Sequence, residues 1–166
     1  MGENGGVIIN ITASLHWNGT ALQAHASAAK AGVDALTKVL ACEWGPHRIR
    51  VVGMLPGAIE NTEGFARLGN PSLANNKEAS KAAFAKTKES GSNGGAFGEE
   101  AATTKVPLLR FGKVQDVANS MLFLASPAAS YMTGTVLNID GGAYLIMPNM
   151  TFGHPEFVQK WKHAKL

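Results

Sequence analysis

The order of segments between Gly6 and Gly57 constrains the fold of this chain more than any other feature of the sequence. A compact β-branched run at residues 6–11 predicts a strand that is buried on both faces of a sheet. The residues that follow predict a long helix up to Trp44, with an apolar stripe at Ala29, Val33, Leu36, Leu40 and Trp44. Residues 51–55 predict a second buried strand, which Pro56-Gly57 ends. A strand, a helix and a strand in this order form a βαβ unit, so we expect a parallel sheet with a right-handed crossover.

This topology also predicts where a ligand would bind. In open parallel sheets the ligand lies beyond the carboxyl ends of the strands. Two loops are therefore expected to flank the site, residues 12–22 after the first strand and residues 56–62 after the second. Lys30 is the only lysine or arginine before residue 36, and it is surrounded in sequence by small side chains. A lone ammonium in this setting suggests a role at the site, with a solvated surface lysine as the alternative.

The rest of the chain predicts an insertion, one more helix and one more strand. Residues 61–68 predict a short helix with Asn61 or Thr62 as its N-cap. Residues 70–105 are rich in Ala, Lys, Glu, Ser and Gly, with a polar helix predicted at 77–88, and we interpret them as a lid or as an exposed insertion without a role.

The carboxyl-terminal third completes the predicted domain. Residues 114–125 predict a helix, and its apolar stripe consists of Val114, Val117, Ala118, Met121, Leu122 and Ala125. Residues 136–139 predict a third strand. We therefore expect one α/β domain at residues 1–150 and an amphipathic tail at residues 151–166.

Composition argues against several classes of protein. The formal net charge is only +3 and the basic residues are scattered, which argues against a nucleic-acid partner. The single cysteine, Cys42, cannot form an internal disulfide, and the spacing of Cys and His predicts no metal site. The apolar runs are too short to span a bilayer, so we expect no stable membrane insertion.

Several motifs resemble the carboxyl-terminal half of the short-chain dehydrogenase/reductase family. They are NITAS, a lysine sixteen residues after Ser14, PG after the next strand, and LLRFGKVQDVANSMLFLASPAASYMTGTVLNIDGG. Within the family, NITASLHW, HASAAKAGVDALTK, EWGPHRIRV, PGAIENTEGFARLG and DGGAYL are most similar to the peroxisomal 2,4-dienoyl-CoA reductases. The resemblance implies the carboxyl-terminal half of a Rossmann-like, doubly wound parallel sheet, with three strands and crossover helices.

The resemblance implies a cofactor site for NADPH. Lys30 matches the family lysine that hydrogen-bonds the nicotinamide ribose, and its charge would favour the electron-rich state of an acyl thioester beside the cofactor. The loop that closes over the cofactor in the family matches Pro56, Gly57, Ala58, Ile59, Glu60, Asn61 and Thr62. Many family members have a threonine where this chain has Asn61, and Thr62 fits the longer loop of the dienoyl-CoA reductases.

The resemblance also implies a substrate and an assembly. Arg67 matches a position that contacts the acyl-CoA substrate in this subgroup, where a guanidinium suits a CoA phosphate; an exposed helix arginine is the alternative. The expected substrate is a fatty acyl-CoA, and the family's tetramer implies a homo-oligomer.

The chain departs from the family pattern at its proton donors. Ala26 stands where most members have the tyrosine of Tyr-x-x-x-Lys, and Leu15 stands where mitochondrial dienoyl-CoA reductases have another tyrosine. The peroxisomal type lacks both and uses an aspartate with a bound water, which would lie before the residues of this chain. Ser14 and Thr12 are the hydroxyls nearest the usual catalytic serine, and we take Ser14 as the candidate.

The amino-terminal half of the family pattern is absent from the sequence. There is no G-x-x-x-G-x-G turn after a first strand, and Gly91-Ser92-Asn93-Gly94-Gly95 has no strand before it. We therefore expect a truncated gene model, a splice form or a fragment, which would leave the edge of its sheet unpaired.

For the complete enzyme, the resemblance implies reduction of a trans-2-dienoyl-CoA to a trans-3-enoyl-CoA in the degradation of unsaturated fatty acids. The hydride would add to the δ-carbon, and water would protonate the α-carbon. Two alternatives remain open: another acyl-CoA-acting reductase of the family, and a non-catalytic product that joins the family's oligomer.

The end of the chain predicts a peroxisomal location. Ala164-Lys165-Leu166 resembles the Ser-Lys-Leu peroxisomal signal, with basic residues shortly before it. We therefore expect the peroxisomal import receptor as a partner, with a random carboxyl terminus as the alternative.

Overall fold

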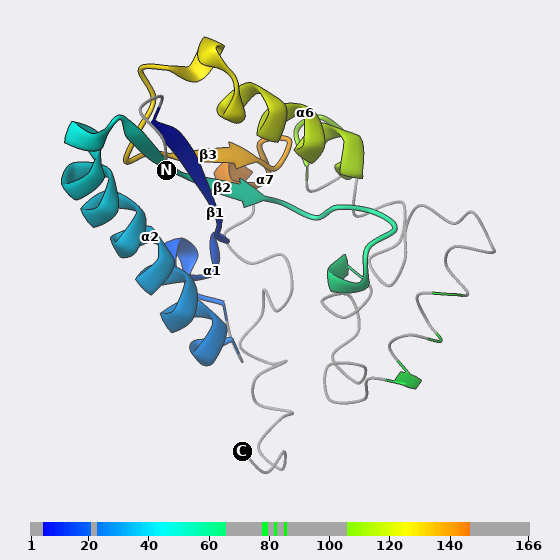
Figure 1. Cartoon of the computed structure of the whole chain (residues 1–166). Helices are drawn as coiled ribbons and strands as arrows, with labels where there is room; N and C mark the ends of the chain where they lie inside the picture. Colours follow the sequence, from blue (N-terminus) through cyan, green and yellow to red (C-terminus); the bar gives the residue numbers. More distant parts are fainter. Residues whose placement is uncertain are drawn as a thin grey trace.

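The computed structural model describes residues 5–20, 23–65, 78–79, 82, 85 and 106–146. Its centre is a three-stranded parallel sheet in the order β1 (Gly6–Ile11), β2 (Ile49–Pro56) and β3 (Val136–Ile139). The long helices α2 (Ala24–Trp44) and α6 (Val114–Ala125) lie on opposite sides of this sheet (Figure 1). The predicted parallel α/β fold is confirmed.

Short helical elements occupy the connections of the sheet. Helix α1 (Leu15–Asn18) lies between β1 and α2, and α7 (Ala143–Ile146) follows β3. The 3-10 turns η1 (Gly45–His47) and η4 (Pro127–Ala129) follow the ends of α2 and α6. Both turns begin with or contain a proline near their start, where the missing N–H is tolerated.

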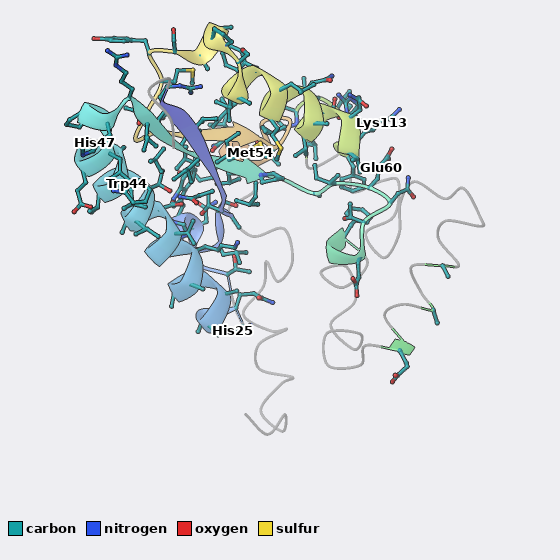
Figure 2. All side chains as sticks on the ribbon, viewed as in Figure 1. His25, Trp44, His47, Met54, Glu60 and Lys113 are labelled. Atoms are coloured by element: carbon teal, nitrogen blue, oxygen red, sulfur yellow. The ribbon has the colours of Figure 1, made fainter. Side chains whose placement is uncertain are left out.

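The core lies around β2, the central strand. Val51, Val52, Met54 and Leu55 are almost completely buried, because side chains alternate between the two faces of the sheet and both faces are covered. On the face toward α6, Val52 and Met54 pack with Leu124 and Ala129 (Met54 is labelled in Figure 2).

The prediction that β1 is buried on both faces is wrong for the described residues. Its four central residues are half-buried and its two ends are exposed. The reason is its position, because β1 pairs with β2 along one edge only and no other described strand lies beside it. Among the described residues, one edge of β1 is therefore unpaired, as expected.

The predicted apolar stripe of α2 lies only partly on the packing face of this helix, because Val33, Leu40 and Trp44 are half-buried and Ala29 is exposed. The buried residues are Asp34, Thr37 and Ala41, whereas Leu36 is 50% exposed. Polar side chains are satisfied at this contact: Asn10 donates a hydrogen bond to the hydroxyl of Thr37, which donates in turn to the carbonyl of Val33. Small and polar residues therefore let α2 approach the sheet closely.

Arg50 fastens the end of α6 to the central strand. Its guanidinium donates hydrogen bonds to the carbonyl oxygens of Leu124 at 2.8 Å and of Ser126 and Met132 at 3.4 Å. A cation at this end of a helix also meets the negative pole of the helix dipole.

Most of the predicted insertion and the whole predicted tail at residues 151–166 lie outside the described residues. Residues 78, 79, 82 and 85 are described and are helical, in agreement with the predicted helix at 77–88. The role of the insertion as a lid stays a prediction. In the described part of the chain, no helix is long and apolar enough to cross a membrane, and no group of Cys, His, Asp and Glu has the arrangement of a metal site.

Candidate functional site

A cavity of about 550 Å³ opens at the carboxyl ends of β1 and β2, between the sheet and α6. The two loops that were predicted to flank the site form its walls, and α6 forms a third wall. Most of the lining is apolar, with hydroxyl groups at Ser14 and Thr62. The lining residues are Ala13, Ser14, Leu15, Pro56, Gly57, Ala58, Ile59, Thr62, Gly64, Phe65, Val114, Val117, Ala118 and Met121.

Lys30 lies beside this cavity, at the carboxyl end of β1. Its Nζ donates a hydrogen bond to the carbonyl oxygen of Ile11 at 2.8 Å. The hydroxyl of Thr12 is 3.5 Å from the carbonyl oxygen of Lys30 and donates to it. The lysine is half-buried and is not part of the cavity lining. Its hydrogen bond places it at the start of the loop at residues 12–22, and its role at the site stays a prediction.

The loop at residues 56–62 is held by neighbouring strands and turns. The N–H of Gly57 donates to the carbonyl oxygen of Ile139 at 2.9 Å. Gly112 fixes the next part of the loop, because its N–H donates to Ala58 at 3.0 Å and its carbonyl accepts from Glu60 at 2.8 Å. These backbone hydrogen bonds fix the loop against β3 and the residues before α6.

Thr62 ends the loop as the predicted N-cap of the following helical residues. Its hydroxyl donates to the carbonyl of Ile59 at 2.7 Å and accepts from the N–H of Phe65 at 3.1 Å. Asn61, the other candidate, has a φ of +57°, a left-handed conformation in which asparagine is more readily accommodated than most residues. Residues 63–65 are helical, and the remaining part of the predicted helix lies outside the described residues.

We expect Gly57→Ala to lower the free energy of unfolding by about 1–3 kcal/mol, because an added methyl group overpacks a tight contact. A Cβ at this position would lie 2.7 Å from Cβ and 2.8 Å from Cα of Asp140. Denaturant unfolding measures the change. Gly32→Ala is the control: its Cβ would meet nothing within 4 Å on α2, so a gain of about 1 kcal/mol is expected from helix propensity. Equal effects of the two substitutions would contradict the close packing at Gly57.

The structure brings most of the predicted residues together. Ser14, Pro56, Gly57, Ala58, Ile59 and Thr62 line the cavity. Glu60 and Asn61 belong to the same loop but do not line the cavity, and Thr12 is buried against α2. Arg67 lies outside the described residues, so its substrate contact stays a prediction. Leu15 also lines the cavity and provides no hydroxyl group there.

Sequence reasoning missed the wall that α6 provides. In its predicted apolar stripe, Val114 and Met121 are 60% and 40% exposed and line the cavity with Val117 and Ala118. The core contact of α6 is made by Leu124, which is fully buried and was not part of the stripe, together with the half-buried Val117 of the stripe. An apolar stripe on a helix cannot by itself tell a filled core from an apolar cavity.

Electrostatic contacts fix the start of α6. Arg110 makes two hydrogen bonds to the carboxylate of Asp116, at 2.7 and 3.1 Å, and the N–H of Lys113 donates to the same carboxylate at 2.7 Å. The hydrogen bonds from Arg110, followed by that from Lys113, lower the pKa of Asp116 to about 2. The same pair raises the pKa of Arg110.

The lowered pKa of Asp116 predicts a contribution to acid stability. The carboxylate stabilises the folded state above its ordinary pKa of 3.8, and this contribution is lost as the pH falls toward about 2. We therefore expect Asp116→Asn to make the free energy of unfolding less dependent on pH in this window, as measured by unfolding at a series of acid pH values. Glu43→Gln, on the exposed surface of α2, should leave the slope unchanged. If Asp116→Asn also leaves the pH dependence of the free energy of unfolding unchanged, the stabilising role assigned to the Asp116 carboxylate is wrong.

Two family models match the chain. One, described as short chain dehydrogenase, matches residues 1–71, and one described as Enoyl-(Acyl carrier protein) reductase matches residues 78–144. Among solved structures, a 7α-hydroxysteroid dehydrogenase in complex with NADH and 7-oxo glycochenodeoxycholic acid is 30% identical with a TM-score of 0.63, over 84% of this chain and 44% of that protein. Acetoin dehydrogenase from Salmonella typhimurium is 27% identical with a TM-score of 0.60, over 88% of this chain and 46% of that protein.

The chain is also similar to proteins named peroxisomal 2,4-dienoyl-CoA reductase [(3E)-enoyl-CoA-producing]. The one from Pongo abelii is 46% identical over 93% of this chain, and the one from Saccharomyces cerevisiae is 40% identical over 97%. The chain spans less than half the length of these relatives, 45% and 47%.

Proposed function

Because the chain belongs to the short-chain dehydrogenase/reductase family, we propose that its residues build part of the active site of an NADPH-dependent 2,4-dienoyl-CoA reductase. The proposed role is the reduction of 2,4-dienoyl-CoA to trans-3-enoyl-CoA in the degradation of unsaturated fatty acids. The observation that carries the proposal is the joint placement of Lys30 and the loop at residues 56–62 at the carboxyl ends of neighbouring strands. The names of the relatives support the substrate class.

The residues around the cavity fit a nicotinamide cofactor. The cavity is apolar over most of its surface and offers the hydroxyl group of Ser14, which suits a flat ring with a few polar substituents. Lys30 would hold the ribose, and the Pro56–Thr62 loop would cover the nicotinamide and the diphosphate. When bound, NADPH would supply the hydride for the reaction.

The chemical contribution of this chain would be mainly electrostatic. The ammonium of Lys30 would stabilise the negative charge that develops on the thioester oxygen of the substrate as a dienolate forms. Its hydrogen bond to Ile11 restricts the side chain before substrate binds, which reduces the cost of orienting it. Ser14, which lines the cavity, would help to position the substrate through its hydroxyl.

Protonation of the α-carbon would not come from the positions that carry tyrosine in other family members. Ala26 and Leu15 have no ionisable group, and Leu15 lines the cavity. We propose that a water molecule donates this proton, held by an acidic residue in the part of the relatives that this chain does not match. Ala26 also disfavours the reduction of a 3-oxoacyl-CoA, which needs an acid beside its carbonyl oxygen.

The proposal extends to the partners and location of the protein. Arg67 would bind a phosphate of CoA, and the protein would form a homo-oligomer as its family does. The Ala164-Lys165-Leu166 end would bind the peroxisomal import receptor. A fluorescent protein fused before residues 151–166 should enter peroxisomes, and removal of the last three residues should leave it in the cytosol.

The proposed activity is tested with the protein purified at its native length from its own cells. We expect loss of dienoyl-CoA absorbance that depends on NADPH, with a trans-3-enoyl-CoA as the product. Turnover of a 3-oxoacyl-CoA in place of the dienoyl-CoA would favour another reductase of the family. Folded protein that binds neither NADPH nor acyl-CoA would overturn the proposal and favour a non-catalytic role in an oligomer.

A further inference from the structure

Three polar side chains from two helices meet between α1 and α2. The Nε2 atom of His16 lies 2.8 Å from Oδ2 of Asp34, and the indole Nε1 of Trp17 donates to the same oxygen at 3.1 Å. We call His16, Trp17 and Asp34 the Asp34 cluster. It lies outside the cavity lining, and neither the sequence motifs nor the proposed chemistry assigns it a role.

The contacts define the hydrogen positions in the cluster. A carboxylate oxygen only accepts hydrogen bonds, so the contact assigns a hydrogen to Nε2 of His16. Among the described residues, Nδ1 of His16 and Oδ1 of Asp34 are buried without a hydrogen-bond partner. Asp34 is only 7% exposed. Burying a carboxylate with one unpaired oxygen is unfavourable, and apolar residues of similar size would pack here at lower cost.

The cluster connects the two sides of the candidate site. His16 and Trp17 directly follow Ser14 and Leu15, which form one wall of the cavity. Asp34 lies one helical turn after Lys30, on the same side of α2. The indole of Trp17 also packs edge-on against Tyr144 of α7, with ring centroids 5.2 Å apart. The short helix α1 has no side-chain N-cap of its own, and these contacts hold it against α2 and α7.

We propose that Asp34, acting through His16 and Trp17, is a positioning residue that sets the distance between the Ser14–Leu15 wall and Lys30. The proposal rests on the proposed function, because it concerns the alignment of substrate between these two sides. Displacement of a reacting group by about 1 Å can lower a rate by about a hundredfold. The buried carboxylate therefore lowers the stability of the fold, and in return it keeps the Ser14–Leu15 wall and Lys30 at a fixed distance.

The test compares three variants of the protein at its native length. Asp34→Leu removes both acceptors and fills the space, Asp34→Asn keeps one acceptor oxygen, and Glu43→Gln changes an exposed acid on the same helix. We expect Asp34→Leu to lower kcat for dienoyl-CoA by about 10- to 100-fold with little change in Tm. Asp34→Asn should recover most of this loss, and Glu43→Gln should match the unaltered enzyme.

Tryptophan fluorescence reports on the cluster independently of activity. In a background in which Trp44, Trp161 and every tryptophan outside residues 1–166 are replaced by phenylalanine, the fluorescence comes from Trp17. We expect Asp34→Leu to increase quenching of Trp17 by acrylamide about twofold, because the indole loses its acceptor. A change in quenching with unchanged kcat would show that the cluster is only a brace and would overturn the proposal. A fall in kcat that is accompanied by a comparable fall in Tm would also overturn the proposal, because loss of structure would then explain the loss of activity.

Failure of the proposed function has a different signature. If the unaltered protein binds NADPH but does not reduce dienoyl-CoA, the proposed function is wrong. The positioning role of Asp34 is then tested by measuring the affinity for NADPH by calorimetry. We then expect Asp34→Leu to weaken that affinity about tenfold, and unchanged affinity would overturn the positioning role. Absence of NADPH binding by the unaltered protein would overturn both.

Discussion

Lys30→Ala is expected to lower kcat/KM for dienoyl-CoA by about 10²–10³-fold, the usual effect of removing one donor that stabilises a developing oxyanion. The side chain is placed for this role before substrate binds, because its Nζ is fixed at 2.8 Å from the carbonyl oxygen of Ile11. The loss should appear in kcat as well as in the affinity for NADPH, since the same ammonium is proposed to hold the ribose. Steady-state kinetics with both substrates measures it.

Lys38→Ala is the matched control for this prediction. Lys38 is an exposed lysine two turns further along α2, far from the end of β1. Its removal should change kcat/KM by less than about twofold, because a solvated surface charge contributes little at this distance. The hydrogen bond that Lys30 loses should cost only about 1 kcal/mol of stability, so both variants remain folded. Similar activity of the two variants would refute the assigned role of Lys30.

The fold was predictable where a local pattern determines it. The run at residues 6–11, the long helix up to Trp44 and the Pro56-Gly57 stop together require a βαβ unit, and the structure has that unit. Burial was less predictable, because it depends on neighbours that lie far away in sequence. Val51 and Val52 are completely buried in the central strand β2, whereas the β-branched residues of the edge strand β1 are half-buried or exposed.

The sequence predicted the two loops of the candidate site but not the wall that α6 forms. Topology alone placed Ser14 and the residues after Pro56 at one edge of the sheet. The α6 wall was missed because Val114 and Met121 have the spacing of ordinary core residues. The Asp34 cluster was missed because His16 and Asp34 are 18 residues apart and match no motif. Such pairs meet only in the folded protein, so a sequence pattern cannot identify them.

Leu124→Ala is expected to lower the free energy of unfolding by about 2–5 kcal/mol, the largest effect on stability among the substitutions considered. Leu124 is completely buried and packs on Val52 and Met54 of the central strand, so its truncation leaves a cavity that close-packed neighbours cannot fill. Leu122→Ala provides a matched control, because it makes the same chemical change two residues away on α6, at a side chain that is 67% exposed. The control should differ from the unaltered protein by no more than about 0.5 kcal/mol in denaturant unfolding. A larger loss from Leu122→Ala than from Leu124→Ala would mean that α6 packs on the sheet through its exposed stripe, and that the wall of the proposed cofactor cavity is assigned to the wrong face of the helix.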